Sequence, residues 1–600
     1  MHRRPMVSSR PLTSPLSATA VLVAALLALS GCSATFDDRS AGQSPTTLKD
    51  ASEGSPAPDQ QRETKIDWTD CDDSVNALSG LECGELEVPL DPNEPDGDRT
   101  SLALARVRST GTAEERIGSL IINPGGPGGS GVEFLGSAAP AFPSELTDRF
   151  DLVSFDPRGV GASDPVRCLD DTEKDEELSV DLTPDTAEEQ AEVDRLADRV
   201  RIECEQRNPE LSTHMSTADV AADVDRIRSA VGDEKLSYLG FSYGSSIGAV
   251  YATLFPERVR AVVLDGSTDP NASAEEQALT QATGFERALD RFVAACDAST
   301  SCPLAPGARA KIEEARASLD AQPVEVDANG ITRTLGPDLF DFGLATALYD
   351  TSLWQSTAQA VVDLRSGGAA KLLALVDRQV GRNSDGTYDN SSDAQIMVNC
   401  SDDVDRLDAE AAAAAEDRIV AAAPRFGPLL GTGLDDCSAW PEPTKPIPSI
   451  AAPESPTVLV VGTVGDPATP YEWSQRMVEA LGSAELLTYE GDGHTAFLTA
   501  GPCITEAVTK YLVDLTVPPV GSRCPAAAGA DPFAGLGETV IEQLAAGGIP
   551  RTLAECIVGK IVEEVGEDEF ERIILENDVD ALTKLATAQT LACATTEPRN

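Results

Sequence analysis

Ser242 lies in the sequence Gly-Phe-Ser-Tyr-Gly, which has the G-x-S-x-G pattern of a nucleophilic serine. Apolar residues before it predict a strand over 236–239, and the residues after it predict a helix over 245–255. A tight turn between a strand and a helix lifts the serine Oγ out of the sheet, and the helix N-terminus favours negative charge there. In this context the pattern predicts a nucleophile, and an ordinary structural turn is the alternative.

A serine hydroxyl needs a base, and only 3 of the 600 residues are histidine. His2 lies at the start of the chain and His214 precedes the serine, whereas His494 follows it in the glycine-flanked loop Gly-Asp-Gly-His. A serine at a strand-to-helix turn takes its partners in the chain order Ser, acid, His. We therefore predict that His494 is the base and that His214 is structural or faces solvent.

The acid should follow a strand between the serine and the histidine. Asp466 comes just after an apolar stretch over 457–461 and has a glycine on its N-terminal side. A carboxylate there can accept a hydrogen bond from Nδ1 of His494, fix the tautomer and stabilise the imidazolium. Asp492 is the alternative acid, but its position two residues before His494 is typical of a loop-forming residue.

A glycine-rich stretch, Asn-Pro-Gly-Gly-Pro-Gly-Gly-Ser-Gly over 123–131, follows a predicted strand over 117–122. Backbone N–H groups in such a loop can point at a substrate oxygen without obstruction by side chains. We predict an oxyanion hole formed by the N–H of Gly126 and the N–H of Tyr243, the residue after the serine. A phosphate-binding loop is the alternative, but the stretch lacks the G-K-[ST] ending.

The elements that must position these residues alternate between strands and helices. This alternation predicts an α/β fold, with a mostly parallel sheet covered by helices on both faces. Between 267 and 447 the alternation stops and the sequence predicts mostly helices. This interval is too long for a loop. The predicted strands are 117–122, 151–155, 236–239, 259–264, 457–461 and 485–489, and the predicted helices are 217–231, 245–255, 471–481 and 505–512.

The order of elements predicts a catalytic domain made of 66–266 and 448–525, interrupted by a helical cap domain over 267–447. A second helical insertion, residues 165–215, lies within the catalytic domain. Residues 531–600 predict a small C-terminal module of amphipathic helices, used for packing or docking.

The N-terminal residues predict export. Basic residues followed by an apolar run over 20–29 and by Leu-Ser-Gly-Cys indicate a lipoprotein signal peptide over 1–31, which leaves Cys32 acylated. A plain secretory signal is the alternative. Residues 32–65 are small and polar, as in a flexible tether, and no later stretch approaches the roughly 18 apolar residues of a membrane span. We expect a lipid-anchored protein on the extracytoplasmic face of the cell membrane, with the lipid as its only membrane contact.

Setting aside Cys32, 12 of the 13 cysteines remain, an even number that is typical of disulfides in an oxidising compartment. A zinc site is the alternative, but no C-x-x-C occurs and histidine is nearly absent, so we expect no metal. Pairing of near neighbours suggests Cys71–Cys83, Cys168–Cys204, Cys296–Cys302, Cys400–Cys437, Cys503–Cys524 and Cys556–Cys593.

The charge balance narrows the range of partners. With 46 basic and 100 acidic residues, the net charge is −54. Nucleic acids bind to basic surfaces, so we expect no nucleic-acid partner. An acidic surface of this kind keeps an exported protein soluble.

Taken together, these residues resemble the exported α/β-hydrolase serine peptidases of family S33, the tripeptidyl- and prolyl-aminopeptidase-like enzymes of actinobacteria. The resemblance covers about 66–524 and implies cleavage of peptide bonds near the free N-termini of peptides or proteins, without a cofactor. It also implies that Ser242 is the nucleophile, Asp466 the acid, His494 the base and Gly126 an oxyanion donor. The matching segments include NPGGPGGSG (123–131), SFDPRGVGASD (154–164), GFSYG (240–244), GTVGDPATP (462–470) and GDGH (491–494).

An exopeptidase of this kind must bind an α-ammonium group, and a buried carboxylate on the cap would do so. Asp402, in Asn-Cys-Ser-Asp, is the candidate, and a solvated acidic stretch is the alternative. An esterase or lipase with the same three residues is the alternative activity, because a sequence does not separate amide from ester substrates. A catalytically idle surface-binding lipoprotein is a third reading, and the oligomeric state is open.

Overall fold

The structure is a computed structural model that describes residues 66–526, apart from 72–79, 182–185, 270, 329–330 and 404, together with parts of 531–593. The predicted signal peptide, the lipidation site Cys32 and the predicted tether lie outside the described residues. Within the described part, none of the helices has the length and apolar character needed to cross a membrane.

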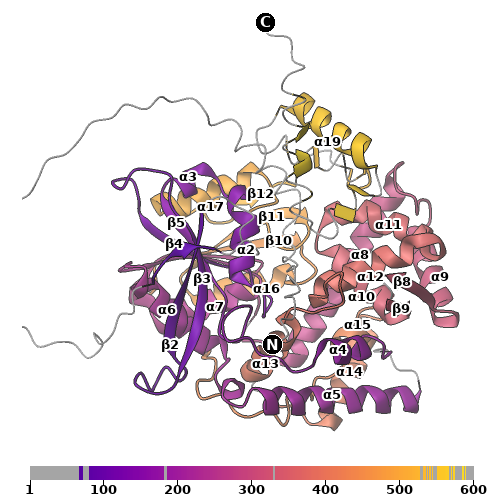
Figure 1. Cartoon of the computed structure of the whole chain (residues 1–600), viewed down its shortest axis with the longest axis horizontal. Coiled ribbons are helices and arrows are strands. Elements are labelled where there is room, and N and C mark those ends of the chain that lie inside the picture. Colours follow the sequence, from indigo (N-terminus) through magenta and orange to yellow (C-terminus); the bar gives the residue numbers. More distant parts are fainter. Residues whose placement is uncertain are drawn as a thin grey trace, which may run out of the picture.

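A sheet of ten strands runs through the larger body of the molecule (Figure 1). Its order is β1-β2-β3-β5-β4-β6-β7-β10-β11-β12, antiparallel from β1 to β5 and parallel from β5 to β12. The mostly parallel α/β sheet predicted from the sequence is thus confirmed. The strands are β1 (Thr69–Asp70), β2 (Leu81–Pro89), β3 (Arg99–Val107), β4 (Gly118–Asn123), β5 (Phe150–Phe155), β6 (Leu236–Phe241), β7 (Val259–Asp265), β10 (Val458–Gly465), β11 (Ala484–Asp492) and β12 (Arg523–Cys524).

The central strands are buried on both faces, as parallel strands between two helical layers must be. Successive side chains of β4 enter different cores: Leu120 and Ile122 pack into one, and Ile121 packs into the other. One core is closed by α2 (Gly131–Ala138), α3 (Ser144–Thr147) and α17 (Pro502–Asp514). The other is closed by α6 (Thr217–Ala230), α7 (Tyr243–Leu254) and α16 (Tyr471–Leu481).

Most of the segment between β7 and β10 packs around a hydrophobic core of its own, whereas residues 394–400 and 440–452 contribute to one of the two cores of the sheet. One feature differs from the helical expectation: β8 (Val324–Ala328) and β9 (Ile331–Leu335) form an antiparallel hairpin. The helices of this segment, called the cap below, are α8 (Ala274–Ala298), α9 (Ala308–Ala321), α10 (Pro337–Leu348), α11 (Trp354–Val362), α12 (Ala369–Val380), α13 (Ser391–Asp402), α14 (Ala409–Ala422) and α15 (Gly427–Gly431).

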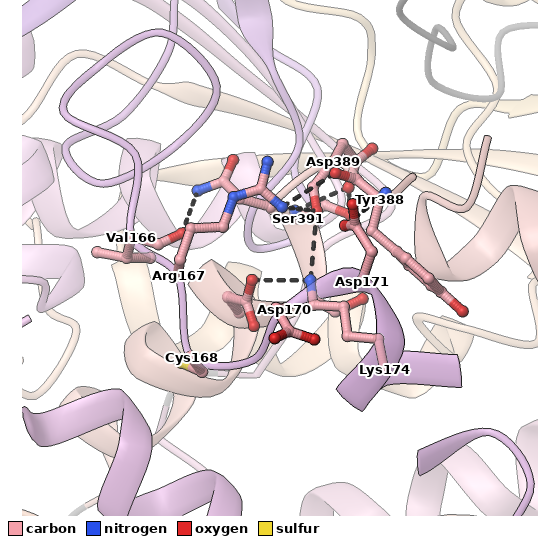
Figure 2. A network of polar contacts seen from close by, with 12 residues as sticks. Val166, Arg167, Cys168, Asp170, Asp171, Lys174, Tyr388, Asp389 and Ser391 are labelled. Atoms are coloured by element: carbon pink, nitrogen blue, oxygen red, sulfur yellow. Dashed lines mark hydrogen bonds and ion pairs between the residues drawn. The ribbon is translucent and has the colours of Figure 1, made fainter. Parts of the chain in front are cut away.

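The insertion after β5 forms α4 (Asp171–Glu177) and α5 (Ala187–Arg207), and it holds the start of α13 in place. Figure 2 shows the network: Arg167 donates to the carbonyls of Tyr388 and Asp389, and Lys174 donates to the Asp389 carbonyl and pairs with Asp393 at 2.7 Å. These bonds tie the cap to the sheet-bearing body, because Arg167 and Lys174 belong to the insertion and the acceptors belong to the cap.

Six disulfides are present, with the pairings that the sequence suggests: Cys71–Cys83, Cys168–Cys204, Cys296–Cys302, Cys400–Cys437, Cys503–Cys524 and Cys556–Cys593. The last of these lies in a C-terminal region that contains α19 (Arg551–Val565) and has its own small core. Phe533, which precedes this region, is buried in the cap core against Phe292 and Trp354.

Candidate active site

Ser242 forms the turn between β6 and α7. Its backbone has φ 53° and ψ −124°, a conformation that a residue with a side chain adopts only under strain. The Ser242 N–H donates to the carbonyl of Asp265 at the end of β7 at 2.9 Å, which helps to hold the strained turn. This is the strand-turn-helix context predicted for the serine.

His494 and Asp466 are in contact, although 28 residues separate them in the sequence. The Nδ1 atom of His494 lies 3.0 Å from each carboxylate oxygen of Asp466. The carboxylate is buried and accepts four further hydrogen bonds, from the backbone N–H groups of Ala468, Thr469 and Thr495 and from the Thr469 hydroxyl. These donors fix the carboxylate as an acceptor for the Nδ1–H of the imidazole, and the Thr469 hydroxyl also lies 3.2 Å from Nδ1.

The end of β7 brings the serine and the histidine to the same place. The carbonyl of Asp265 accepts the Ser242 N–H, and a Cβ on the next residue, Gly266, would lie 3.3 Å from Cε1 of His494. Only a residue without a side chain lets the imidazole approach the chain this closely. The histidine ring therefore lies against the strand end that also carries the serine turn.

Electrostatics favour the protonated form of His494. Burial on its own would lower the pKa of the imidazole, but the charge and hydrogen bond of Asp466 act the other way, as does the charge of Asp265. The balance raises the pKa of His494 above its ordinary value. An imidazole with these neighbours can take up a proton near neutral pH and give it back.

The glycine-rich loop between β4 and α2 passes directly over the serine turn. A Cβ on Gly125 would lie 2.9 Å from Cβ of Ser242 and 3.0 Å from the backbone nitrogen of Tyr243. Gly126 is the next residue along the chain, so both nominated oxyanion donors belong to segments in contact at the serine. The Tyr243 N–H is also the first of helix α7, where the helix dipole favours an anion.

This geometry agrees with the relatives of the chain. Residues 118–501 match the family model described as alpha/beta hydrolase fold. The chain belongs to the α/β-hydrolase family. It is 38% identical over 476 residues to the serine protease Hip1 of Mycobacterium tuberculosis, a match that covers 76% of this chain and 91% of that protein.

Two other relatives extend the comparison. The hydrolase is 34% identical over 529 residues to carboxylesterase B of Mycobacterium tuberculosis, which covers 86% of this chain and 98% of that protein. It is 32% identical over 466 residues to the tripeptidyl aminopeptidase of Streptomyces coelicolor, with 75% and 84% covered. The fold and family expected from the resemblance are therefore confirmed, and the chain is a serine hydrolase.

His214 and Asp492, the alternatives to His494 and Asp466, have other hydrogen-bond or ion-pair partners. The Nδ1 atom of His214 lies 2.8 Å from the Thr444 hydroxyl, as befits the structural role expected of it. Asp492 forms an ion pair with Arg291 of the cap, with 3.0 Å between Oδ1 and Nη1. Asp466, and not Asp492, is the carboxylate that the structure places against His494.

Asp402, the candidate ligand for an α-ammonium group, ends helix α13 and reaches the body of the hydrolase. Its carboxylate accepts hydrogen bonds from the N–H and the hydroxyl of Thr217, the first residue of α6. The Thr217 hydroxyl is in turn 2.6 Å from the Tyr243 hydroxyl. Burial raises the pKa of Asp402 to about 7. These contacts tie the cap to α6 beside the serine turn, and the use of Asp402 as a substrate ligand stays a prediction.

Three residues near the site were not singled out by chemistry at the sequence level. Thr469 supports Asp466, and the carboxylate of Asp265 accepts the N–H groups of Ala496 and Phe497 just after His494. The ring of Tyr349, from the cap, packs edge-on against the imidazole. Asp265 could have been predicted from the sequence, because it ends a buried strand and the carboxyl ends of parallel strands are where such sites form.

Proposed function

We propose that this hydrolase is a serine peptidase that cleaves peptide bonds near free N-termini, with Ser242 as nucleophile, Asp466 as acid and His494 as base. The observation that carries the proposal is the contact of the His494 Nδ1 with a fixed Asp466 carboxylate at the strand end that also holds the strained Ser242 turn. Such a contact leaves Nε2 as the free, basic nitrogen of the ring.

The reaction proceeds in two acyl-transfer steps. Nε2 of His494 takes the proton from Ser242 Oγ as the oxygen attacks the scissile carbonyl carbon, and the resulting oxyanion is bound by the N–H groups of Gly126 and Tyr243. The protonated imidazole then gives its proton to the leaving amine as the C–N bond breaks. Water, deprotonated by His494, then attacks the acyl carbon, the bond from that carbon to Ser242 Oγ breaks, and the imidazole returns the proton to Oγ. The N-terminal fragment leaves as a carboxylic acid.

Acidic groups close to the glycine-rich loop support recognition of a free amino terminus. Glu133, in the first turn of α2, directly follows that loop, and burial together with the charges of Asp156 and Asp389 raises the pKa of Glu133 to about 8. A positively charged group brought in by the substrate would favour the ionised form of Glu133, lower its pKa and pair with the carboxylate. Two of the relatives, named a serine protease and a tripeptidyl aminopeptidase, also support a peptide substrate.

A carboxylesterase is the second candidate, supported by the 34% identity to carboxylesterase B over nearly the whole length of that protein. With the same three residues, Ser242 would attack an ester carbonyl. An alkoxide is a better leaving group than an amine, so its departure depends less on protonation by His494. An ester has no ammonium group, so the acidic surroundings of Glu133 would have no partner in that reaction.

The test compares matched substrates on the full mature chain. Peptides with free N-termini, the same peptides acetylated, and short acyl esters are incubated with the enzyme, and the products are identified by mass spectrometry. We expect release of short N-terminal fragments from the free peptides only. Rapid ester hydrolysis without any peptide cleavage would instead establish the esterase, and a lack of any turnover together with no fluorophosphonate adduct on Ser242 would refute both.

We also propose that Cys32 is lipidated and that the enzyme is held at the extracytoplasmic face of the cell membrane. The six disulfides support an oxidising compartment, since such bonds rarely persist in the cytosol. The expected result is that the wild type fractionates with membranes and that a Cys32→Ser variant is released. Equal membrane association of the two proteins would contradict the proposal.

A further inference from the structure

The loop that carries His494 is anchored through four consecutive backbone N–H groups. The His494 N–H donates to the carbonyl of Tyr349 at 2.8 Å, and the Thr495 N–H donates to Asp466 at 3.4 Å. The N–H groups of Ala496 and Phe497 both donate to the Asp265 carboxylate. Two of these three acceptors belong to the sheet-bearing body, but Tyr349 belongs to the cap.

Tyr349 contacts the His494 segment in three ways. It follows the last turn of α10, and its carbonyl accepts the His494 N–H. Its ring centroid lies 5.3 Å from that of the imidazole, at an angle of 83°. Its carbonyl also lies so close to Gly493 that a Cβ there would be 3.2 Å from it. Both the backbone and the side chain of this one cap residue therefore contact His494.

The contact continues into the centre of the cap through a row of aromatic rings. Phe426 packs against Phe285 of α8 with 5.6 Å between centroids, and Phe285 packs against Tyr349 with 5.7 Å. Both phenylalanines are buried in the cap core. Packed interiors transmit displacement rather than absorb it, so a shift of the cap core would move the ring that lies on the imidazole.

The His494 loop has reason to need this support. Gly493 has φ 100° and Thr495 has φ 65°, and a positive φ is a strained conformation for a β-branched residue such as threonine. A loop with that conformation keeps it only while its surroundings enforce it. The cap anchor precedes Thr495, and the Asp265 anchor follows it, so each restrains one side of the strained residue.

We propose that Tyr349 is a positioning residue that couples docking of the cap to the placement of the His494 imidazole between Asp466 and Ser242. The proposal rests on the catalytic roles proposed above for these three residues. In this role the cap holds the His494 imidazole in position when it packs against the sheet-bearing body. The Tyr349 hydroxyl has no part in this role, which belongs to the ring and the carbonyl.

The chain is well suited to a direct test, because it has only three histidines. In the full chain labelled with ¹⁵N-histidine, the proton of the His494 Nδ1–H···Asp466 hydrogen bond gives its own NMR signal whether or not turnover occurs. The variants are Tyr349→Phe, which keeps the ring, and Tyr349→Leu, which removes it while preserving apolar volume. Phe292→Leu is the matched control, since Phe292 lies in the same cap core but packs on Trp354 and Phe533 instead.

We expect Tyr349→Phe to keep both the Nδ1–H signal and the rate of Ser242 labelling by a fluorophosphonate. In Tyr349→Leu the signal should broaden or vanish and labelling should slow by about 10- to 100-fold, the size of effect that follows a misplacement of ~1 Å. Phe292→Leu should lower the melting temperature comparably and leave both readouts intact.

The outcomes separate this inference from the proposed function. An unchanged signal or an unchanged labelling rate in Tyr349→Leu would overturn the positioning role, and so would an equal loss in Phe292→Leu. If the wild type itself does not label at Ser242, the proposed function fails, and the NMR signal alone then decides whether Tyr349 holds His494 in place.

Discussion

The imidazole of His494 and the carboxylate of Asp466 share a hydrogen bond in which Nδ1 lies 3.0 Å from both oxygens. This symmetric contact is possible because Ala468 and Thr469 hold the carboxylate with three donors of their own. This contact favours the tautomer that carries its hydrogen on Nδ1, and it leaves Nε2 as the nitrogen that can accept a proton.

The first prediction concerns pH. The base must be neutral to accept a proton from Ser242, so kcat/KM falls as the pH drops through the pKa of His494 in the free enzyme. Because Asp466 and Asp265 raise that pKa above the ordinary value of 6.5, the midpoint of the acidic limb should lie above 6.5. The measurement is kcat/KM from about pH 5 to 9. A rate that stays flat well into the acidic range would exclude His494 from this role.

The second prediction concerns Thr469. Its hydroxyl donates to Oδ2 of Asp466 at 2.8 Å, and a hydrogen bond to a charged group contributes about 1.5–3 kcal/mol. Thr469→Val keeps the shape of the side chain and removes this donor, so kcat should fall roughly tenfold or more with little change in KM. Thr469→Ser restores the hydroxyl and should restore most of the rate. Equal activity of the valine and serine variants would show that the hydroxyl is not needed.

The third prediction concerns the recognition of amino termini. Glu133→Gln removes the carboxyl group whose pKa burial and neighbouring acids raise to about 8. The KM for peptides with free N-termini should rise about tenfold, while the KM for short acyl esters should not change. Glu145→Gln, at an exposed position in α3, is the control and should change neither value. A parallel change for all substrates would mean that Glu133 does not contact the ammonium group.

The fourth prediction concerns stability. Arg158 and Asp223 form an ion pair at 2.8 Å in which neither side chain has any exposed surface. Asp223→Asn leaves the guanidinium buried without its carboxylate, and breaking such a pair costs about 3–5 kcal/mol. Thermal and urea unfolding should show this loss. Asp198→Asn is the control, because Asp198 pairs with Arg201 while 71% exposed and should change stability by less than about 0.5 kcal/mol.

Much of the fold could be predicted because buried strands and amphipathic helices leave strong periodic patterns. The predicted helix over 471–481 matches α16. The predicted strand over 117–122 differs from β4 by one residue at each end, and the predicted strand over 259–264 is one residue shorter than β7. The hairpin of β8 and β9 was missed, since its strands are short and half-exposed, although Asn-Gly at 329–330 is a hairpin signal. The half-exposed strands β2 and β3 were likewise not predicted.

Some residues of the candidate site could also be predicted from the sequence, and others could not. Ser242, Asp466 and His494 could be named because their chemistry and chain order are distinctive in a chain with few histidines. Tyr349 and Phe285 could not, because nothing in a tyrosine or phenylalanine of a helical segment shows that it will lie on an imidazole from another part of the chain. Such contacts depend on how the cap seats on the body, and that arrangement is a property of the whole tertiary structure.

Strands β7 and β10 are hydrogen-bonded neighbours, with Val263 opposite Leu459, yet the entire cap lies between them in sequence. During synthesis Ser242 therefore emerges before Asp466 and His494, with the whole cap segment between them. Strands β10 and β11 complete the parallel part of the sheet next to β7. Asp466 directly follows β10, and His494 follows β11. A chain that ends before β10 therefore contains Ser242 but lacks Asp466 and His494.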